Sequence, residues 1–281
     1  MQDFKGALAF ITGGASGIGL GIARALAAQG ACLALADLRE DHLAEAVELA
    51  AREGWGDRCL PLKLDVTDRT GFAAALDAAE ARFGALRVLV NNAGVGINGP
   101  IVEASFADWD WGVDVNLGGV INGLVLGLPR LRAHDLPAAI LNTASLAPFI
   151  PARPLRGIYA AAKAAVVLAT EHLALDLAET PIGVSVLCPG PVTTNIHQAA
   201  LLRPATYGEA SAAFLEVENE ALTGEPPAPG PMWRDPLAVG ELCVGAMRER
   251  RLYVFPHPEF LPITQKRHAA IEAALVLSTP G

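Results

Sequence analysis

The residues best suited to chemistry lie between positions 145 and 163. Tyr159 and Lys163 are four residues apart at the start of an apolar, helix-forming run, and Ser145 follows the apolar stretch 138–143. Positions i and i+4 of a helix share a face, so the Lys163 ammonium would lie beside the Tyr159 phenol and lower its pKa, which is about 10 in a free tyrosine. Such a tyrosine can act as general acid or base, with Ser145 holding a substrate oxygen. An interfacial tyrosine next to a solvated lysine has the same spacing, so the hypothesis depends on the rest of the chain.

A glycine-rich turn lies between an expected strand at 7–12 and an expected helix that ends near Gly30. Glycines permit a tight turn and a close approach of backbone to a pyrophosphate, and the helix N-terminus adds N–H donors and a positive dipole end. The spacing is G-x-x-x-G-x-G, and no Gly-Lys-Ser/Thr of a P-loop follows. The turn predicts a dinucleotide site, although such a turn can also be merely structural. The expected contacts are Gly13, Ser16, Gly17, Ile18 and Gly19.

Asp37 ends the second expected strand, 32–36, and lies 20 residues after Gly17. An acidic side chain at this place can hydrogen-bond the adenosine ribose hydroxyls, and it would repel the 2′-phosphate of NADP. Arg39 is close enough to weaken that repulsion. We therefore predict NAD rather than NADP as the cofactor. The alternative is that Asp37 caps the helix beginning near Glu40, and it could do both.

Polar and small residues also follow later strands, at the edge where a parallel sheet binds its ligand. The pair after the strand at 59–64 could meet an adenine edge. Asparagines buried at the end of the strand 86–90 must satisfy several donors and acceptors, so they could brace the sheet, contact the cofactor, or both. We expect Asn91 to brace the sheet and the segment 92–94 to lie near the cofactor. The turn after the strand at 183–188 is the third such place. The expected cofactor contacts here are Asp65, Val66, Asn92, Ala93, Gly94, Pro189, Gly190, Val192 and Thr194.

Short apolar runs alternate with helix-forming stretches along the chain, which is typical of an α/β protein with parallel strands. We see no internal repeat and no interdomain linker, and 281 residues suffice for one domain spanning 1–281. The expected strands are 7–12, 32–36, 59–64, 86–90, 138–143, 183–188 and 252–255. The expected helices after the first are 40–53, 69–83, 105–132, the run from Tyr159, 236–249 and 259–276.

The long expected helix 105–132, with Ser105 as its candidate cap, contains residues that are unfavourable in a helix. Each of its glycines costs about 1 kcal/mol relative to alanine. Close packing, within the subunit or between subunits, would explain why they are tolerated. Asn116 lies in the middle of this helix and is expected to distort it and hold a water. The glycines are Gly118, Gly119, Gly123 and Gly127.

The stretch 195–234 shows no clear periodicity and contains EPPAPGP at 225–231. A structureless segment of this length is usually functional or disordered. We interpret it as a lid over the substrate, followed by a C-terminal strand and helix within 251–277; a surface excursion is the alternative. The expected substrate contacts are Ser145, Tyr159, Phe149, Phe214, Met232 and Trp233.

Composition narrows the class of protein. Hydrophobic residues make up 52% of the chain and charged ones 18%, which excludes disorder, and the net charge of −9 with no Lys/Arg run argues against a nucleic-acid partner. No stretch reaches 18 apolar residues without a polar break, so we expect no transmembrane helix, and the start of the chain does not resemble a signal peptide. Cys32, Cys59, Cys188 and Cys243 lack metal-type spacing, which predicts free thiols in a reducing cytoplasm and no metal site.

Taken together, these motifs resemble the short-chain dehydrogenase/reductase family. The match runs in order from residue 5 to about 195 and comprises TGGASGIG, Asp37, Asp65-Val66, NNAG, Asn116, Ser145, YAAAK and PGPVTT. The resemblance implies a single-domain, Rossmann-type, doubly wound parallel sheet of about seven strands with helices on both faces. It also implies an NAD(P)-dependent oxidoreductase acting on a small-molecule alcohol or ketone. Members are usually homodimers or homotetramers, so a homo-oligomer is expected.

The resemblance further implies a catalytic tetrad of Asn116, Ser145, Tyr159 and Lys163. In the family, the tyrosine exchanges a proton with the substrate oxygen, which the serine hydrogen-bonds. The lysine lowers the tyrosine pKa and holds the nicotinamide ribose, and the asparagine positions a water that relays protons to the lysine.

One departure concerns the loop 151–157. Ser145 and Tyr159 are 14 residues apart, one more than is usual in the family, and the extra residue is expected in this loop. The loop also carries Arg153 and Arg156, which could meet an anionic substrate or simply be exposed.

A finer likeness narrows the substrate. Phe4 and the stretches 109–124, 203–208 and 253–259 look like bacterial dehydrogenases that oxidise the benzylic Cα alcohol of lignin-type aryl ethers with NAD. The expected function is therefore the interconversion of a bulky, aromatic secondary alcohol and its ketone. The alternatives are an NADP-linked carbonyl reductase or hydroxysteroid dehydrogenase, and a non-catalytic dinucleotide sensor, which would not need the tetrad.

Overall fold

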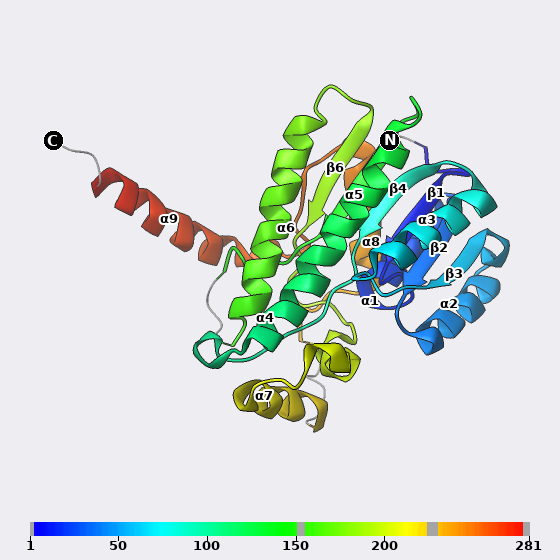
Figure 1. Ribbon diagram of the computed structural model, residues 1–281. Coiled ribbons are helices and arrows are strands. Elements are labelled where there is room, and N and C mark those ends of the chain that lie inside the picture. The colour runs from blue at the N-terminus through cyan, green and yellow to red at the C-terminus, as the bar shows by residue number, and fades with distance from the viewer. Residues whose placement is uncertain (1–2, 151–154, 224–229, 278–281) are drawn as a thin grey trace.

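The computed structural model describes residues 3–150, 155–223 and 230–277 and contains one parallel sheet (Figure 1). The strand order is β3-β2-β1-β4-β5-β6-β7, so the direction of winding reverses between β1 and β4. The carboxyl ends of these two strands define the crevice where such sheets bind ligands. The expected fold class is confirmed. The strands are β1 Leu8–Thr12, β2 Cys32–Asp37, β3 Cys59–Lys63, β4 Leu86–Asn91, β5 Ala138–Thr143, β6 Ile182–Leu187 and β7 Tyr253–Val254.

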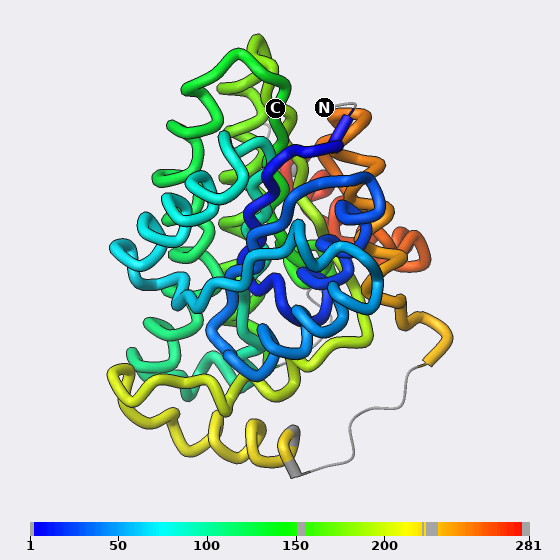
Figure 2. Tube along the Cα trace, turned by 90° about the vertical axis from the view of Figure 1, so that its right-hand side faces the viewer, coloured from blue at the N-terminus to red at the C-terminus, as the bar shows by residue number. Residues whose placement is uncertain are grey.

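Helices cover both faces of the sheet (Figures 1 and 2). Helices α1, α2 and α8 pack on one face, and α3, α5 and α6 pack on the other. The helices are α1 Gly17–Ala28, α2 Glu40–Arg52, α3 Arg69–Phe83, α4 Phe106–Val113, α5 Gly119–Arg132, α6 Gly157–Asp176, α7 Ala212–Thr223, α8 Pro236–Glu249 and α9 Leu261–Leu277.

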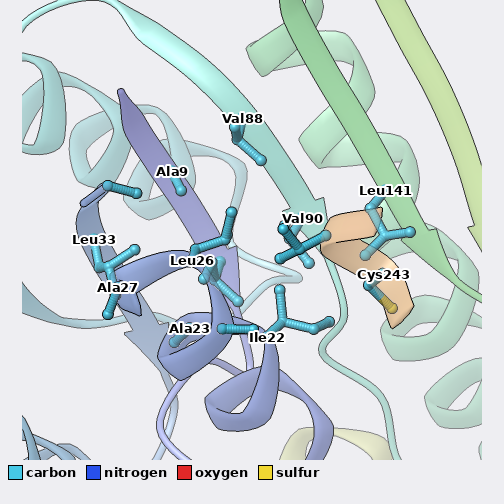
Figure 3. Packing of buried hydrophobic residues seen from close by; sticks show 14 of the residues in the cluster. Ala9, Ile22, Ala23, Leu26, Ala27, Leu33, Val88, Val90, Leu141 and Cys243 are labelled. Atoms are coloured by element: carbon cyan, nitrogen blue, oxygen red, sulfur yellow. The ribbon is translucent and has the colours of Figure 1, made fainter. Parts of the chain in front are cut away.

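Alternation along the strands divides the core between the two faces. Ala9 and Ile11 of β1 face α1, whereas Leu8 and Phe10 face α3, because successive side chains point to opposite sides of a sheet. Figure 3 shows Ile22 and the side chains around it packed between the strands and α8. Each such buried aliphatic side chain contributes about 1.5–3 kcal/mol.

The expected helix 105–132 is interrupted. Its first part, α4, begins with a capping box in which Ser105 and Asp108 bond each other's backbone N–H groups. A π-helical turn at Asp114–Gly118 then separates α4 from α5, and Asn116 lies within it. This turn confirms the expected distortion of the helix at Asn116. The Asn116 side-chain amide donates to the Gly112 carbonyl, four residues earlier.

Three of the glycines in this region let α5 pack directly on β4 and on the segment after β3. A Cβ on Gly123 would lie 1.9 Å from the Asn91 Oδ1, and one on Gly127 would lie 2.8 Å from Leu89. Gly119 similarly faces Val66. Of the two explanations for the glycines, close packing within the subunit is therefore the one seen at these positions.

The lid segment 195–234 is more regular than expected. It contains 3-10 turns at Ile196–Leu202 and Ala205–Tyr207 and the helix α7, while 224–229 lies outside the described residues. The expectation of irregular structure was wrong because tertiary contacts, rather than a periodic pattern, hold this segment. Figure 2 shows it running along one end of the molecule. The C-terminal strand and helix expected within 251–277 are β7 and α9, and Figure 1 shows α9 projecting away from the sheet.

Two helical stretches are long and apolar enough to cross a membrane by length and composition, Phe106–Arg132 and Gly157–Asp176. No membrane-spanning helix is expected from the sequence, because no stretch reaches 18 apolar residues without a polar break. Both stretches pack on one face of the sheet, and buried core helices commonly pass the same test.

The glycine packing generates a matched pair of variants. Gly123→Ala should lower the free energy of unfolding by about 1–3 kcal/mol, because the added methyl collides with the Asn91 side chain. Gly118→Ala should be neutral or stabilising by up to about 1 kcal/mol, because the nearest atom to its Cβ, the Val113 oxygen, is 3.8 Å away. Urea denaturation measures both, and equal effects of the two substitutions would refute intrasubunit packing as the reason for Gly123.

Candidate active site

A chain of hydrogen bonds links the carboxyl ends of β1, β4 and β5. The Thr12 hydroxyl accepts from the backbone N–H groups of Asn92 and Ala93 at 2.9 and 3.1 Å. The Asn92 amide donates to the Thr12 and Gly13 carbonyls and accepts from the Thr143 hydroxyl at 3.2 Å. The Asn92 side chain, expected near the cofactor, is thus occupied in bracing the glycine-rich turn. Asn91 braces the sheet as expected, since it donates to Asn142 at 2.8 Å.

The glycine-rich turn forms a backbone surface without side chains. Gly13 and Gly17 have positive φ angles of 59° and 49°, which favour glycine. A Cβ on Gly19 would lie 2.0 Å from the Gly13 oxygen, so no side chain fits there. Ser16 is the N-cap of α1 but makes no side-chain cap, which leaves the first N–H groups of the helix for an anion. Ile18, by contrast, packs against the hydrophobic core. The turn therefore fits a dinucleotide pyrophosphate.

Asp37 joins the end of β2 to this turn. Its Oδ2 accepts from the Ala15 N–H at 3.2 Å and its Oδ1 from the Arg39 N–H at 3.1 Å. The N-cap of α2 is Arg39, so the alternative role of Asp37 as that cap is not seen. A carboxylate has about four acceptor positions, so two remain for ribose hydroxyls. The Arg39 guanidinium is paired with Asp41 instead of pointing to a free phosphate position.

Asp65 and Val66, the pair expected near the adenine edge, form hydrogen bonds within the protein. Asp65 accepts from the backbone N–H and hydroxyl of Thr67 at 2.9 and 2.8 Å. The Val66 carbonyl accepts from the Asn122 amide at 2.8 Å, and its side chain is buried against α5. The backbone after β3 is thereby fixed in position.

The turn after β6, residues 189–194 (the cofactor loop), meets the glycine-rich turn. A Cβ on Gly17 would lie 3.0 Å from the Thr194 side chain. At the other end of the loop, the Pro189 carbonyl accepts from the Leu146 N–H at 3.0 Å, next to Ser145. The backbone of Val192 forms an isolated, parallel β-bridge with that of Arg234. The structure therefore brings two of the expected cofactor-binding stretches, the glycine-rich turn and the cofactor loop, into contact.

Three members of the expected tetrad converge at the ends of β5 and α6. The exposed fractions of Ser145, Tyr159 and Lys163 are 8%, 9% and 2%. Burial raises the pKa of the Tyr159 phenol, and the opposing influences are its hydrogen bond with Ser145 and the positive charge of Arg156. The Lys163 ammonium donates to the Thr143 carbonyl at 2.9 Å and lies 6.0 Å from the centre of the Tyr159 ring. We expected the Lys163 ammonium to lower the Tyr159 pKa. The positive charge that lowers it in the structure is that of Arg156.

Burial also lowers the pKa of Lys163 to about 8. At pH 7 most of the ammonium therefore remains charged, and it keeps a proton that can be exchanged near neutral pH.

Asn116, the fourth member, is completely buried and bonded to backbone. Its Oδ1 accepts from the Val95 N–H at 3.1 Å, and its amide donates to the Val95 and Gly112 carbonyls at 3.0 Å. A Cβ on Gly94 would lie 2.8 Å from the Asn116 Oδ1 and 3.2 Å from the Lys163 Nζ. Gly94 thus separates the two side chains, and Asn116 fixes the segment after β4 instead of offering a free amide to a water.

The expected substrate residues fall into different surroundings. Phe214 is 1% exposed and packs on Gly99 in one cluster with Tyr159, so it anchors the lid segment and is not an open contact surface. Phe149 packs edge-on against Phe255, with ring centres 5.4 Å apart. Met232 is 44% exposed and, with Trp233, precedes the bridge to the cofactor loop.

A buried polar cluster that sequence reasoning missed holds the lid segment on α4. Arg203 and Asp108 form an ion pair at 2.9 Å with side-chain exposures of 8% and 0%. Although burial disfavours its charge, hydrogen bonds from Ser105, Arg203 and Ser211 keep the pKa of Asp108 below its usual range. The Arg203 guanidinium also stacks 5.3 Å from the centre of the Trp111 ring. The S-x-x-D pattern at Ser105 could have revealed the cap, but nothing local indicates the Arg203 partner.

Two other functional links were also missed. Asn195 accepts from the Ser16 hydroxyl at 3.4 Å and contacts His42 at 3.3 Å, which ties the lid segment to the glycine-rich turn. Thr12 and Thr143 were visible only as polar residues at strand ends. Arg153 and most of the loop 151–157 lie outside the described residues; the described Leu155 has a φ of 68°.

Among the described residues, no group of three or more His, Cys, Asp and Glu side chains is arranged to hold a metal ion. All four cysteines are free thiols; Cys188 and Cys243 are buried, and Cys32 and Cys59 are half-buried.

Comparison with known proteins agrees with this geometry. The family model of short chain dehydrogenases matches residues 7–203. The chain is 39% identical to the C alpha-dehydrogenase of Sphingobium sp. (strain NBRC 103272 / SYK-6) over 272 residues, 96% of this chain and 87% of that protein.

Solved structures give the same result. A short chain dehydrogenase/reductase from Burkholderia phymatum in complex with NAD superposes with a TM-score of 0.88 at 35% identity, covering 98% of this chain and 97% of that one. The apo form of LigO from Sphingobium sp. strain SYK-6 superposes with a TM-score of 0.79 at 37% identity, covering 98% and 91%. The chain therefore belongs to the short chain dehydrogenase family of oxidoreductases.

Proposed function

We propose that this protein is an NAD-dependent dehydrogenase that interconverts a bulky, benzylic secondary alcohol and its ketone, with Tyr159 as general acid and base. The position of Tyr159 carries the proposal. Its phenol pairs with Ser145 among the polar strand ends, while its ring belongs to an apolar cluster with Trp111 and Phe214. A hydroxyl carried by an apolar aromatic group suits such a boundary. The identity of 39% with a C alpha-dehydrogenase supports this substrate class.

Each side chain has a defined task in the oxidation. Tyr159 takes the hydroxyl proton, and Ser145 hydrogen-bonds the oxygen that loses it. Because burial raises the pKa of the Tyr159 phenol, positive charge is needed near the phenolate; Arg156 supplies one charge, and we propose that the buried Lys163 ammonium, 6.0 Å from the centre of the Tyr159 ring, supplies a second. The Thr143 carbonyl keeps that ammonium in place. When bound, NAD supplies the hydride acceptor.

The residues present fit NAD better than NADP. The glycine-rich turn and the start of α1 would hold the pyrophosphate, and Asp37 would hold the adenosine ribose. Asp37 carries a negative charge at this position, and the nearby Arg39 is paired with Asp41. Neither feature favours an additional phosphate on the ribose.

Turnover with Tyr159→Phe tests the reaction. The wild-type protein should reduce NAD with aryl carbinols, and Tyr159→Phe should lower kcat by about 10²–10⁴-fold, because the general base is lost. Tyr253→Phe is the matched control, since Tyr253 is 40% exposed and bonds only the surface Glu171 among the partners seen. The assay is the absorbance of reduced cofactor with NAD or NADP across aryl carbinols, steroid alcohols and simple secondary alcohols.

The outcomes separate the alternatives. NADP-linked turnover of steroid alcohols or simple ketones would replace the substrate and cofactor assignments. Dinucleotide binding without turnover of any tested alcohol would favour a sensor. Full activity of Tyr159→Phe would contradict the proposed acid–base role.

Asp37→Asn tests the cofactor preference. The substitution keeps an acceptor oxygen for the Ala15 N–H but removes the charge, so the ratio of NAD to NADP affinity should fall by about tenfold or more, equivalent to about 1.4 kcal/mol. Glu48→Gln removes the same charge from the distant, exposed end of α2 and should leave the ratio unchanged. Dissociation constants from tryptophan fluorescence measure both; an unchanged ratio in Asp37→Asn would show that the ribose lies elsewhere.

We also infer a homo-oligomer formed through α5 and α6. Val125 on α5 and Leu168 on α6 are 65% and 57% exposed, and Ile121 and Leu175 add to this apolar face. Exposed apolar surface of this kind favours a protein interface. The wild-type protein should be a dimer or tetramer by light scattering, and the double variant Val125→Glu/Leu168→Glu should form smaller species. Val47→Glu, on α2, should not change the mass; a monomeric wild type would contradict the inference.

A further inference from the structure

His257 is a buried histidine with two backbone partners in the cofactor loop. It lies after β7 and is 1% exposed. Its Nδ1 accepts from the Gly190 N–H at 2.9 Å, and its Nε2 lies 2.9 Å from the Pro191 carbonyl oxygen. A backbone N–H only donates and a carbonyl only accepts, so these partners assign the proton to Nε2 and leave Nδ1 bare. The ring is therefore a neutral imidazole that bonds two successive loop residues.

The surroundings of the His257 ring favour its neutral form and hold it against the cofactor loop. Burial lowers the pKa of His257, which favours the neutral form. The charged groups facing it are Arg234, which precedes α8, and Glu259 in the 3-10 turn Pro258–Phe260; they pair with each other at 2.8 Å. The Phe260 ring packs edge-on, with its centre 6.2 Å from that of the imidazole. A Cβ on Gly190 would lie 3.0 Å from the imidazole, so the loop packs directly on the ring.

The rest of the loop depends on this contact. The Pro191 carbonyl also accepts from the Arg234 N–H at 3.1 Å, and the Thr193 N–H donates to the Arg234 carbonyl at the same distance. The next residue, Thr194, packs against Gly17 of the glycine-rich turn. A shift of the loop at Gly190 would therefore reach the contact between the two predicted cofactor-binding stretches.

We propose that His257 is a positioning residue that holds the cofactor loop 189–194 in the conformation that binds the dinucleotide. The proposal rests on the NAD site of the proposed function. A histidine that only fills the core would stabilise the fold without favouring one loop conformation. Here both ring nitrogens bond the loop itself, so losing the ring should weaken cofactor binding and leave the chemical step largely unchanged.

Three substitutions dissect the two hydrogen bonds. His257→Ala removes both. His257→Asn keeps an oxygen near the Nδ1 position as an acceptor for Gly190, and His257→Gln keeps an N–H near the Nε2 position as a donor to Pro191. His268→Ala removes an exposed histidine on α9 and is the matched control. The Asn and Gln variants keep the proposal testable if His257→Ala does not fold.

The readouts are the Kd for NAD by calorimetry, kcat at saturating NAD, and Tm. We expect Kd to rise about tenfold or more in His257→Ala and by about fivefold in the Asn and Gln variants, in line with about 1 kcal/mol per hydrogen bond. The value of kcat should stay within about threefold, and His268→Ala should match the wild type. A folded His257→Ala or Gln variant with wild-type Kd would overturn the proposal, as would a loss confined to Tm or to kcat.

The pH dependence gives a second readout. Protonation puts a hydrogen on Nδ1, which can then no longer accept from the Gly190 N–H. Since burial lowers the pKa of His257, the neutral contact is present above that pKa and is lost as the pH falls through it, which lies on the acid side of the ordinary histidine pKa. Wild-type NAD affinity should therefore fall more steeply on acidification than that of His257→Gln; parallel profiles would contradict the proposal.

Failure of this proposal and failure of the proposed function give different results. A wild-type protein that binds NAD but oxidises no aryl carbinol contradicts only the substrate class. A wild-type protein that binds no nicotinamide dinucleotide contradicts the cofactor site and the role of His257 with it.

Discussion

The hydrogen-bonded chain across the ends of β1, β4 and β5 is the constraint on which the site depends. It runs from the glycine-rich turn through Thr12, Asn92 and Thr143 to Lys163. Buried polar groups without partners cost about 1–3 kcal/mol each, so every member fixes its neighbour. The turn predicted to hold the cofactor and the ammonium beside Tyr159 therefore cannot move independently. Their relative position is a property of the sheet rather than of either motif.

The packing of α5 also fixes part of the site in position. Glycine at position 123 brings the helix onto β4, and the π-helical turn directs the Asn116 amide to the backbone of Val95. Gly94, between Asn116 and Lys163, leaves no room for a side chain there. The local costs of glycines and a distorted turn in a helix are thus offset by a fixed segment after β4.

The lid segment is held by charge as well as by apolar packing. Phe214 packs in the cluster around Tyr159, and Arg203 of the Arg203–Asp108 pair contacts the ring of Trp111 in the same cluster. Glu218 of α7 is buried near this pair, and burial raises its pKa; its Oε1 has no hydrogen-bond partner among the described residues. Removing one member of a buried pair costs about 3–5 kcal/mol, so this cluster favours one seating of the lid over others.

The sequence alone determined the α/β class, the seven strands and the glycine-rich turn, and it singled out Ser145, Tyr159 and Lys163 as candidates, because these follow from local periodicity and motif spacing. It did not determine which partner each polar side chain bonds. Asn92 braces the turn, Lys163 bonds the Thr143 carbonyl, and the described part of the lid segment forms two 3-10 turns and α7. These outcomes depend on groups far apart in the chain, and His257 meets Gly190, 67 residues away, only in the folded protein. Burial and hydrogen-bond satisfaction are decided in three dimensions, so only the tertiary structure could assign them.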